Sequence, residues 1–461
     1  MAETDLVAAQ SDFRLFRDIL EDAHPALTEY ITTDRKNFLF DSVYKTIDKK
    51  LSLRELYKKM AFLVNETGCS HTYTSLPTAI TDTLYNRKLF FPFPAILLNN
   101  GLYINSDDEL PHGTKILSVN GIPTTRILDS LMFYNPVEGF HRETQRYATA
   151  GDFGFDYYVH FGVPRKFELL LKDTSGKIET QFFDPVTLDE LTTRKNSSYY
   201  YDATDVTYSF SINDETGYAL LRLTDFEMGS SNQQTAFENF LKNSFELLSK
   251  KKEIRHLIID LRENTGGDLY NCFLLHSYLA KNPFPEYKKV FSRVRKISYE
   301  DYLSVATDFG DIGKINTRLK KEFLARSPYG YYIPDSLIDI WEPDPLRFTG
   351  STYIITNHKV ASAASYFILL TKNNGTVMVI GTETCGGGYS GNGFRMLEYQ
   401  LPASGIRFNF PYAKMIYSYN ERKTGRGLIP DYAVPDTYSS FIKNEDCQLL
   451  YINDSLILKN K

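Results

Sequence analysis

Cysteine is scarce in this chain: its 461 residues include four, and none belongs to a C-x-x-C pair. The sequence therefore predicts no zinc site and no framework of disulfides. Lysine and arginine form no block, and the formal net charge is −5. This charge argues against a surface that binds nucleic acid or an anionic membrane.

Long apolar runs are missing too. No run reaches the roughly 20 residues that a membrane-spanning helix requires, so no transmembrane segment is expected. The first residues, MAETDLVAAQSDF, lack the charged and apolar regions of a signal peptide. Either the protein is cytoplasmic, or this is a mature form whose signal has been replaced by an initiator methionine.

The remaining composition is that of a globular protein, with 42% hydrophobic and 24% charged residues. The length predicts two or three domains. Between Asp12 and Val64, apolar residues recur every three or four positions, which predicts helices that end at Gly68. We place an N-terminal helical region at 1–85.

The next region, 86–195, changes to short β-rich pieces. Its segment LPHGTKILSVNGIPTTRILDSL predicts a Gly-bounded turn, an alternating strand, an Asn-Gly turn and a helix. This order resembles a PDZ-like domain, and an ordinary hairpin followed by a helix is the alternative. A polar stretch, KNSSYYYDATD, predicts a linker to a third region.

The third region, 205–445, alternates apolar runs such as HLIIDL with helical segments. The alternation predicts βα units around a buried sheet, and hence an α/β fold. Residues 298–345, which are polar and aromatic, interrupt it. They predict either an insertion over a groove or a long surface loop.

Two turns of this region suit acyl-transfer chemistry. In IIDLRENTGGDLY, a strand runs into a turn with Gly266 and Gly267, whose bare N–H groups suit a phosphate or an oxyanion. In VASAAS, Ser362 stands between a strand and a helix, with the N–H of Ala363 beside it. Capping of the helix by Ser362 or Ser365 is the alternative.

A nucleophilic serine needs a base. Among the eight histidines, His71 differs because it lies in a short loop of small residues, GCSHTYTSLP, between a helix and an extended segment. An ordinary exposed loop histidine is the alternative.

Six segments of the chain, taken in order, resemble one family. They are the GCSHT loop, the PDZ-like segment, IIDLRENTGG, VASAAS, VIGTETCGGG and GRGLIPDYAV. It is the family of tail-specific or C-terminal processing serine peptidases and their tricorn-core relatives. The resemblance runs from about Asp12 to Val434. It implies a ClpP/crotonase-like βα catalytic domain, a polypeptide substrate, and no metal or organic cofactor.

Carried over residue by residue, the family's nucleophile falls on Ser362. The family's oxyanion hole uses an amide of the Gly-Gly turn and the amide after the nucleophile. These fall on Gly266 or Gly267 and on Ala363.

The resemblance also implies the base. Ser-Lys members carry a lysine in the Gly-rich turn, where this chain has Gly387. The tricorn-like branch uses a histidine preceded by a serine, as in Ser70-His71, so we expect His71 to be the general base, oriented in part by Ser70. That branch adds a glutamate where this chain has Thr424. We expect Glu383, ahead of Glu421, to take its place.

These residues predict a serine-type peptidase with an acyl-enzyme on Ser362. One alternative is a non-catalytic protein that binds peptides or small ligands on the same scaffold, as retinoid-binding relatives do. Another is an acyl-CoA enzyme of the crotonase-like fold, which leaves the Ser-His pair without a role. We expect the cell envelope, periplasm or extracellular space, with the signal removed; the cytoplasm is the alternative.

The cysteines follow from this assignment. If the loops around His71 and Ser362 line one cleft, Cys69 and Cys385 lie near each other. They then form either a disulfide, which requires Cα atoms within about 7 Å, or two separate buried thiols.

Overall fold

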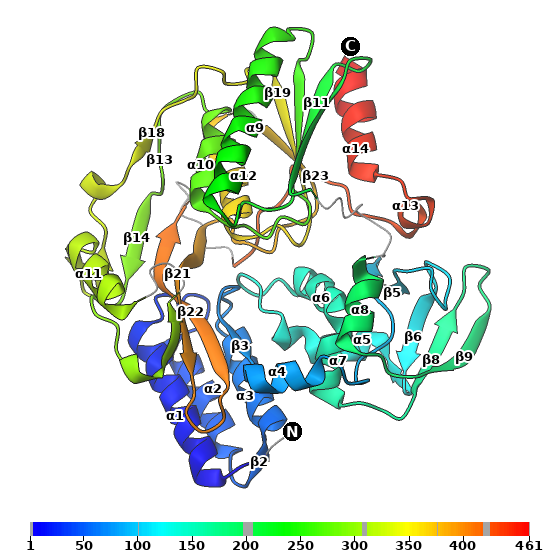
Figure 1. The fold of residues 1–461 in the computed structure, drawn as a ribbon, viewed down its shortest axis with the longest axis vertical. Helices are drawn as coiled ribbons and strands as arrows, with labels where there is room; N and C mark the ends of the chain where they lie inside the picture. Colours follow the sequence, from blue (N-terminus) through cyan, green and yellow to red (C-terminus); the bar gives the residue numbers. More distant parts are fainter. Residues whose placement is uncertain are drawn as a thin grey trace.

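The computed structural model describes residues 3–99, 101–196, 206–306, 311–375, 377–417 and 425–460. Its elements form N-terminal helices, a β-rich module beside them, and a large α/β region above both in the view of Figure 1. Most of the predicted linker, together with Thr424 and Glu421, lies outside the described residues. In the described part, no helix is both long and apolar enough to cross a membrane.

The N-terminal region is helical, as the apolar spacing predicts. Phe13 and Phe16 are buried and pack against the ring of Phe40. The chain leaves the last long helix near Gly68, whose φ is +67°. The elements are β1 (Glu3–Thr4), α1 (Leu6–Ala23), α2 (Thr33–Lys45), β2 (Leu51–Ser52), α3 (Leu53–Asn65), β3 (Tyr73–Ser75) and α4 (Thr78–Leu84).

The β-rich module contains an antiparallel sheet in the order β4-β5-β6-β8-β9, with β7 paired to β6. The predicted Asn-Gly turn is present: Asn120 and Gly121, both with positive φ, join β6 to β7 ahead of a helix. The strands are β4 (Ala95–Leu98), β5 (Gly101–Ile104), β6 (Lys115–Val119), β7 (Ile122–Pro123), β8 (Phe167–Lys172) and β9 (Ile178–Phe183). The helices are α5 (Thr124–Leu131), α6 (Arg142–Gly151), α7 (Phe153–Phe161) and α8 (Leu188–Asn196).

The α/β region is built on a sheet in the order β10-β11-β12-β19-β20-β23, parallel except for β10. Its strands are β10 (Tyr208–Asn213), β11 (Tyr218–Leu223), β12 (His256–Asp260), β19 (Ser351–Thr356), β20 (Val377–Gly381) and β23 (Tyr432–Ala433). Leu257 and Ile259 face the main core, whereas Ile258 packs with Ile452 on the other face. Both faces are buried, which explains the continuous apolar run HLIIDL. The expected α/β fold is confirmed.

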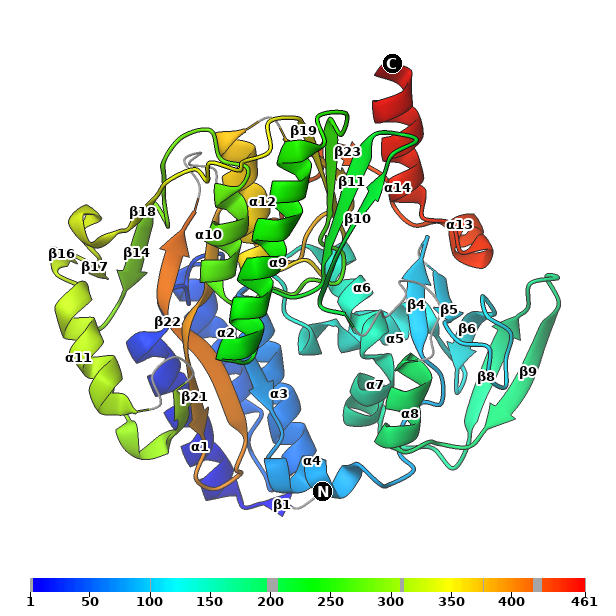
Figure 2. The same cartoon turned by 45° about the horizontal axis from the view of Figure 1, so that its top comes forward.

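Helices cover both faces of this sheet. Figures 1 and 2 show α9, α10 and α12 on one side and α14 on the other. Their bounds are α9 (Ser231–Lys250), α10 (Leu269–Ser277), α12 (Ser362–Asn374) and α14 (Cys447–Tyr451), which continues through Ile452–Ile457; α13 (Tyr438–Lys443) precedes α14.

A second sheet, in the order β15-β21-β22-β14-β17-β16 with β3 also paired to β22, reaches the N-terminal helices. The ring of Phe408 contacts Phe16 where the β21–β22 hairpin meets α1 (Figure 2). Residues 298–345 form several of its elements, so this segment is more than a surface loop. Its other strands are β14 (Lys289–Ser292), β15 (Leu303–Ala306), β16 (Ala325–Ser327), β17 (Gly330–Tyr332), β21 (Ser390–Gln400) and β22 (Arg407–Ile416). The same part of the chain contains α11 (Ile312–Glu322) and the strands β13 (Phe284–Pro285) and β18 (Ile340–Trp341), which pair with each other in a separate two-stranded sheet.

Candidate active site

Ser362 begins α12, after the loop that follows β19. Its φ of +49° lies in the left-handed region, which is costly for a residue other than glycine. Capping does not explain either serine. The N-cap residue is Ala361, without a side-chain cap, and the Oγ of Ser365 donates to the carbonyl of Val360 at 3.2 Å. Within the described chain, the Oγ of Ser362 makes no hydrogen bond.

The glycine turn after β12 packs directly on Ser362. A Cβ added to Gly266 would lie 2.6 Å from the Cβ of Ser362 and 3.1 Å from the amide nitrogen of Ala363. The N–H of Gly266 donates to the Oδ1 of Asn264 at 2.9 Å. The N–H groups of Gly267 and Ala363, in contrast, donate to no acceptor among the described residues. Of the two glycine amides that the sequence leaves open, Gly267 is the available one.

A chain of hydrogen bonds ends at His71. The Nδ1 of His71 lies 3.1 Å from the Oγ of Ser70, and this hydroxyl donates to the Oε2 of Glu138 at 3.2 Å. The hydroxyl of Tyr30 donates to the other carboxylate oxygen, Oε1, at 2.7 Å. In the part of the chain that is described, the Nε2 of His71 has no hydrogen-bond partner, and it does not bond to Ser362.

Glu138 comes from the β-rich module and is 1% exposed. Its N–H donates to the carbonyl of Cys385 at 3.4 Å, and the next N–H, of Gly139, donates to the carbonyl of Gly68 at 2.7 Å. The turn that carries Glu138 thus contacts both the histidine loop and the Gly-rich turn after β20. Cys69 and Cys385 belong to these two loops. Each is a thiol, so they do not form the disulfide that is one of the two alternatives.

Glu383 lies in a different cluster from the one expected. Its carboxylate pairs with the guanidinium of Arg426, accepts the N–H of Gly427 at 2.9 Å, and lies 3.2 Å from the Nε2 of His141. The carboxylate bonded to Ser70 is that of Glu138 instead. Glu138 is not identifiable from the sequence, because its neighbours, NPVEGFH, carry no motif that singles it out.

The Gly-rich turn leaves little room for side chains. A Cβ added to Gly386 would lie 2.4 Å from the Oγ of Ser365, and Gly387 pairs with Gly427. A lysine near Glu138 is Lys414 of β22, whose charge influences that carboxylate. Its Nζ lies 2.6 Å from the Oε2 of Glu29, and the two side chains are 6% and 9% exposed. The charge of this lysine is therefore already neutralised by a carboxylate.

Burial controls the protonation of the His71 network. It lowers the pKa of His71 to about 4, so the ring is neutral at neutral pH, as a general base requires. Burial also raises the pKa of Glu138 to about 7, against hydrogen bonds from Tyr30 and Ser70 that favour the carboxylate. Glu138 is therefore the member of this network that titrates near neutral pH.

Gly393 of β21 lies against the Nε2 edge of the His71 ring. A Cβ at this position would come within 2.2 Å of Nε2 and 2.5 Å of Cδ2. We expect Gly393→Ala to displace the imidazole and to lower kcat by about 10²-fold, as small misplacements of catalytic groups do. Steady-state kinetics measures this effect. The matched control is Gly151→Ala, where a Cβ meets nothing within 4 Å; equal losses in both variants would contradict the prediction.

The α/β region belongs to a known class of domain. Residues 217–434 match the sequence model of peptidase family S41, so the chain carries a peptidase family S41 domain. This stretch includes Gly266, Gly267 and Ser362, whereas His71 and Glu138 precede it.

The fold of the whole chain is similar to that of CPAF. Mature CPAF complexed with lactacystin is 14% identical, with 99% of each chain covered and a TM-score of 0.68. Mature CPAF is 15% identical, with 98% of this chain and 99% of that chain covered and a TM-score of 0.66. A serine-to-alanine mutant of CPAF is 15% identical, with 97% and 98% covered and a TM-score of 0.66. At these identities the likeness establishes a shared fold.

Proposed function

We propose that the protein is a serine-type peptidase that hydrolyses peptide bonds through an acyl-enzyme on Ser362. One observation carries this proposal: Ser362 begins α12 in a left-handed conformation, against the Gly266–Gly267 turn, with its hydroxyl unbonded within the described residues. The family S41 domain around it supports peptide hydrolysis as the reaction. The substrate would then be a polypeptide, lying extended along a strand edge near the site.

In this mechanism His71 is the general base. The hydroxyl of Ser70 donates to the Glu138 carboxylate, so in this mechanism its oxygen accepts the Nδ1–H of His71. This direction of donation leaves the lone pair on Nε2, which takes the proton of Ser362 and later gives it to the leaving amine. His71 and Ser362 must therefore come within hydrogen-bond distance when substrate is bound, because catalytic hydrogen bonds tighten in the working complex.

The oxyanion of the tetrahedral intermediate is assigned to the amides of Gly267 and Ala363. Both are available in the described structure, and the N-terminus of α12 adds a favourable dipole. Loss of one such donor typically costs about 3–4 kcal/mol of transition-state stabilisation. Water then hydrolyses the acyl-enzyme, with His71 acting again as base.

A fluorophosphonate probe tests the proposal directly. Labelling of the full chain, followed by peptide mass spectrometry, is expected to give one adduct, on Ser362. Lactacystin, which is bound in one CPAF structure, is a second probe. A folded protein that neither reagent labels would contradict the proposal and would favour a non-catalytic binding protein on this scaffold.

The pH dependence of kcat/KM is expected to follow Glu138. The ionised carboxylate accepts from Ser70 more strongly than the protonated carboxyl does, and so favours the His71 proton on Nδ1. Activity should therefore rise with pH through about 7, rather than through the value of about 4 set for His71. Glu138→Gln should lower kcat by about 10²-fold. This loss is smaller than the loss caused by replacing an acid that contacts the catalytic histidine directly. The substitution should also remove the rise in activity near pH 7.

Tyr30→Phe is the matched control for the pH profile. It keeps the carboxylate but removes a donor that lowers its pKa, so the rise should move to higher pH. If Glu138→Gln keeps the wild-type profile, another group titrates and the assignment of Glu138 is wrong.

A further inference from the structure

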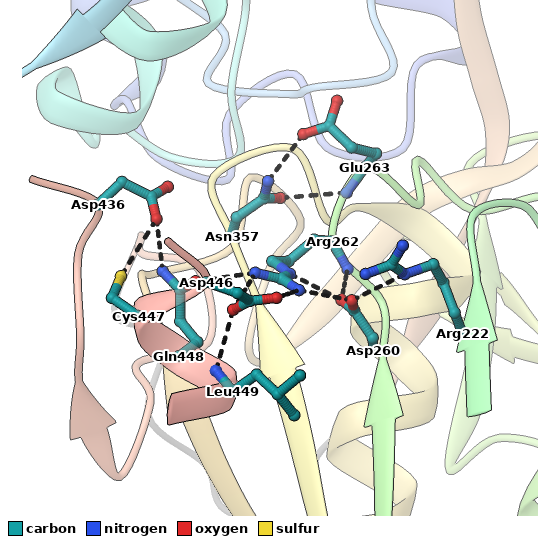
Figure 3. Close-up of polar contacts among 10 residues, drawn as sticks. All are labelled: Arg222, Asp260, Arg262, Glu263, Asn357, Asp436, Asp446, Cys447, Gln448 and Leu449. Carbon is teal, nitrogen blue, oxygen red and sulfur yellow. Dashed lines mark hydrogen bonds and ion pairs between the residues drawn. The ribbon is translucent and has the colours of Figure 1, made fainter. Parts of the chain in front are cut away.

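Arg262, two residues after the end of β12, is a buried cation whose five side-chain N–H donors all bond to neighbouring side chains (Figure 3). Its Nε donates to Asp260 at 2.9 Å, and its Nη2 donates to Asp260 at 2.7 Å and to Asp446 at 2.6 Å. Its Nη1 donates to Asp446 and to Gln448, both at 2.9 Å. Arg222 adds a bond to Asp260 at 3.1 Å. The Arg262 side chain is 3% exposed, so these bonds, and not water, determine its position.

Much of this coordination comes from the end of the chain. Asp446 also caps α14 by accepting the N–H of Leu449 at 3.0 Å. Gln448 is held in turn, because its Nε2 donates to the carbonyl of Val434 and to Asp436. The apolar residues that follow pack on the face of the sheet that carries Ile258, Ile355 and Ile380; they are Ile452, Leu456 and Ile457. We call the segment Asp446–Ile457 the C-terminal brace.

The charges of this cluster balance only with the brace in place. Arg222 and Arg262 supply two positive charges, and Asp260 and Asp446 supply two negative charges. The pKa of Asp260 is lowered, because the two arginines outweigh the effect of burial. Neutralising Asp446 would leave a buried guanidinium without half of its charged partners, which is strongly unfavourable.

Arg262 leads directly into the turn assigned to the oxyanion. The backbone carbonyl of Asn264 accepts the N–H of Ala361 at 3.2 Å. The side-chain Oδ1 of Asn264 accepts the N–H of Gly266 at 2.9 Å. Figure 3 also shows Asn357, from the loop before Ser362, donating to Glu263 at 2.9 Å. The turn is thus fixed at Arg262 on one side and bonded to the nucleophile loop on the other. A shift of Arg262 would move the glycine amides relative to Ser362.

We propose that the C-terminal brace positions the oxyanion-binding turn, with Asp446 and Gln448 as positioning residues that act through Arg262. The proposal rests on the serine peptidase function proposed above. It assigns to the end of the chain a role in stabilising the transition state, in addition to its packing on the sheet. The brace lies beyond the stretch that matches family S41.

The test compares Asp446→Asn with Asp454→Asn in the whole chain of 461 residues. Asp454 is an exposed carboxylate on the same segment that is hydrogen-bonded by Asn453. Asp446→Asn is expected to lower kcat at least about tenfold while KM changes less than about twofold, because the lost interaction belongs to the transition state. Amide hydrogen exchange in the peptide spanning 261–268 should also become faster. Asp454→Asn should change neither quantity.

Gln448→Met keeps the test valid if Asp446→Asn fails to fold. It removes one acceptor of Arg262 without a change in charge, so a smaller loss in the same direction is expected. Wild-type kcat, or wild-type exchange at 261–268, in folded variants at both positions would overturn the proposal. Failure of the wild-type protein to react with fluorophosphonate would instead overturn the peptidase function, while the exchange measurement would still report whether the brace holds the turn.

Discussion

Replacing Ser362 with alanine is expected to abolish fluorophosphonate labelling and to lower the rate of peptide hydrolysis by about 10⁶-fold, the effect typical of losing a serine nucleophile. Its Oγ makes no hydrogen bond within the described residues, and alanine meets the same backbone strain at φ +49°. The thermal midpoint should therefore change little. Gel-based labelling and thermal unfolding measure the two quantities on one sample.

Ser365→Ala is the matched control for this prediction. Ser365 lies one turn further along α12, is 1% exposed, and donates to the carbonyl of Val360. Its loss should lower the free energy of unfolding by about 1 kcal/mol, as for a typical internal hydrogen bond, and should leave labelling intact. Labelling lost in Ser365→Ala and kept in Ser362→Ala would show that the nucleophile has been misassigned.

Replacing His71 with alanine is expected to lower kcat by about 10⁴- to 10⁶-fold with little change in KM, because proton transfer is lost only in the transition state. Steady-state kinetics on a peptide substrate measures both constants. His141→Ala is the control, because His141 contacts Glu383 and Arg426 instead of the Ser70 network.

A His71→Ala enzyme with near wild-type activity would exclude the Ser-His mechanism. A lysine base would then show as a rise in rate toward the lysine value of about 10.4. Lys414 would be the residue to examine, although its pairing with Glu29 opposes such a role.

The two turns that carry Ser362 and Gly266–Gly267 could be predicted from the sequence because local features define each of them. The chain passes from a strand rich in β-branched residues, through small residues, into an apolar helix. This order places Ser362 in a strand-to-helix turn. The choice between the amides of Gly266 and Gly267 could not be predicted in the same way. It depends on the side chain of Asn264, whose Oδ1 accepts the N–H of Gly266 and not that of Gly267.

The acid of the histidine network is a clearer case. Glu138 is far from Ser70 in sequence, and it reaches the site because Gly139 and Gly68 allow two backbones to approach closely. A Cβ on Gly68 would lie 3.0 Å from the carbonyl of Gly139. Such a meeting depends on how the β-rich module packs, which no local pattern encodes. Glu383 is nearer to Ser362 along the chain, but its carboxylate pairs with Arg426 instead.

The turn around Glu138 joins segments that leave the ribosome at very different times. Tyr30 and His71 are synthesised before Glu138. Cys385, whose carbonyl accepts the N–H of Glu138 at 3.4 Å, and Gly425, whose carbonyl accepts the N–H of Phe140 at 3.3 Å, are synthesised long after it. A growing chain therefore carries His71 for 291 residues before it carries Ser362. On the proposed mechanism, the growing chain cannot hydrolyse peptides until Ser362 has been synthesised and the segments around Glu138 have come together.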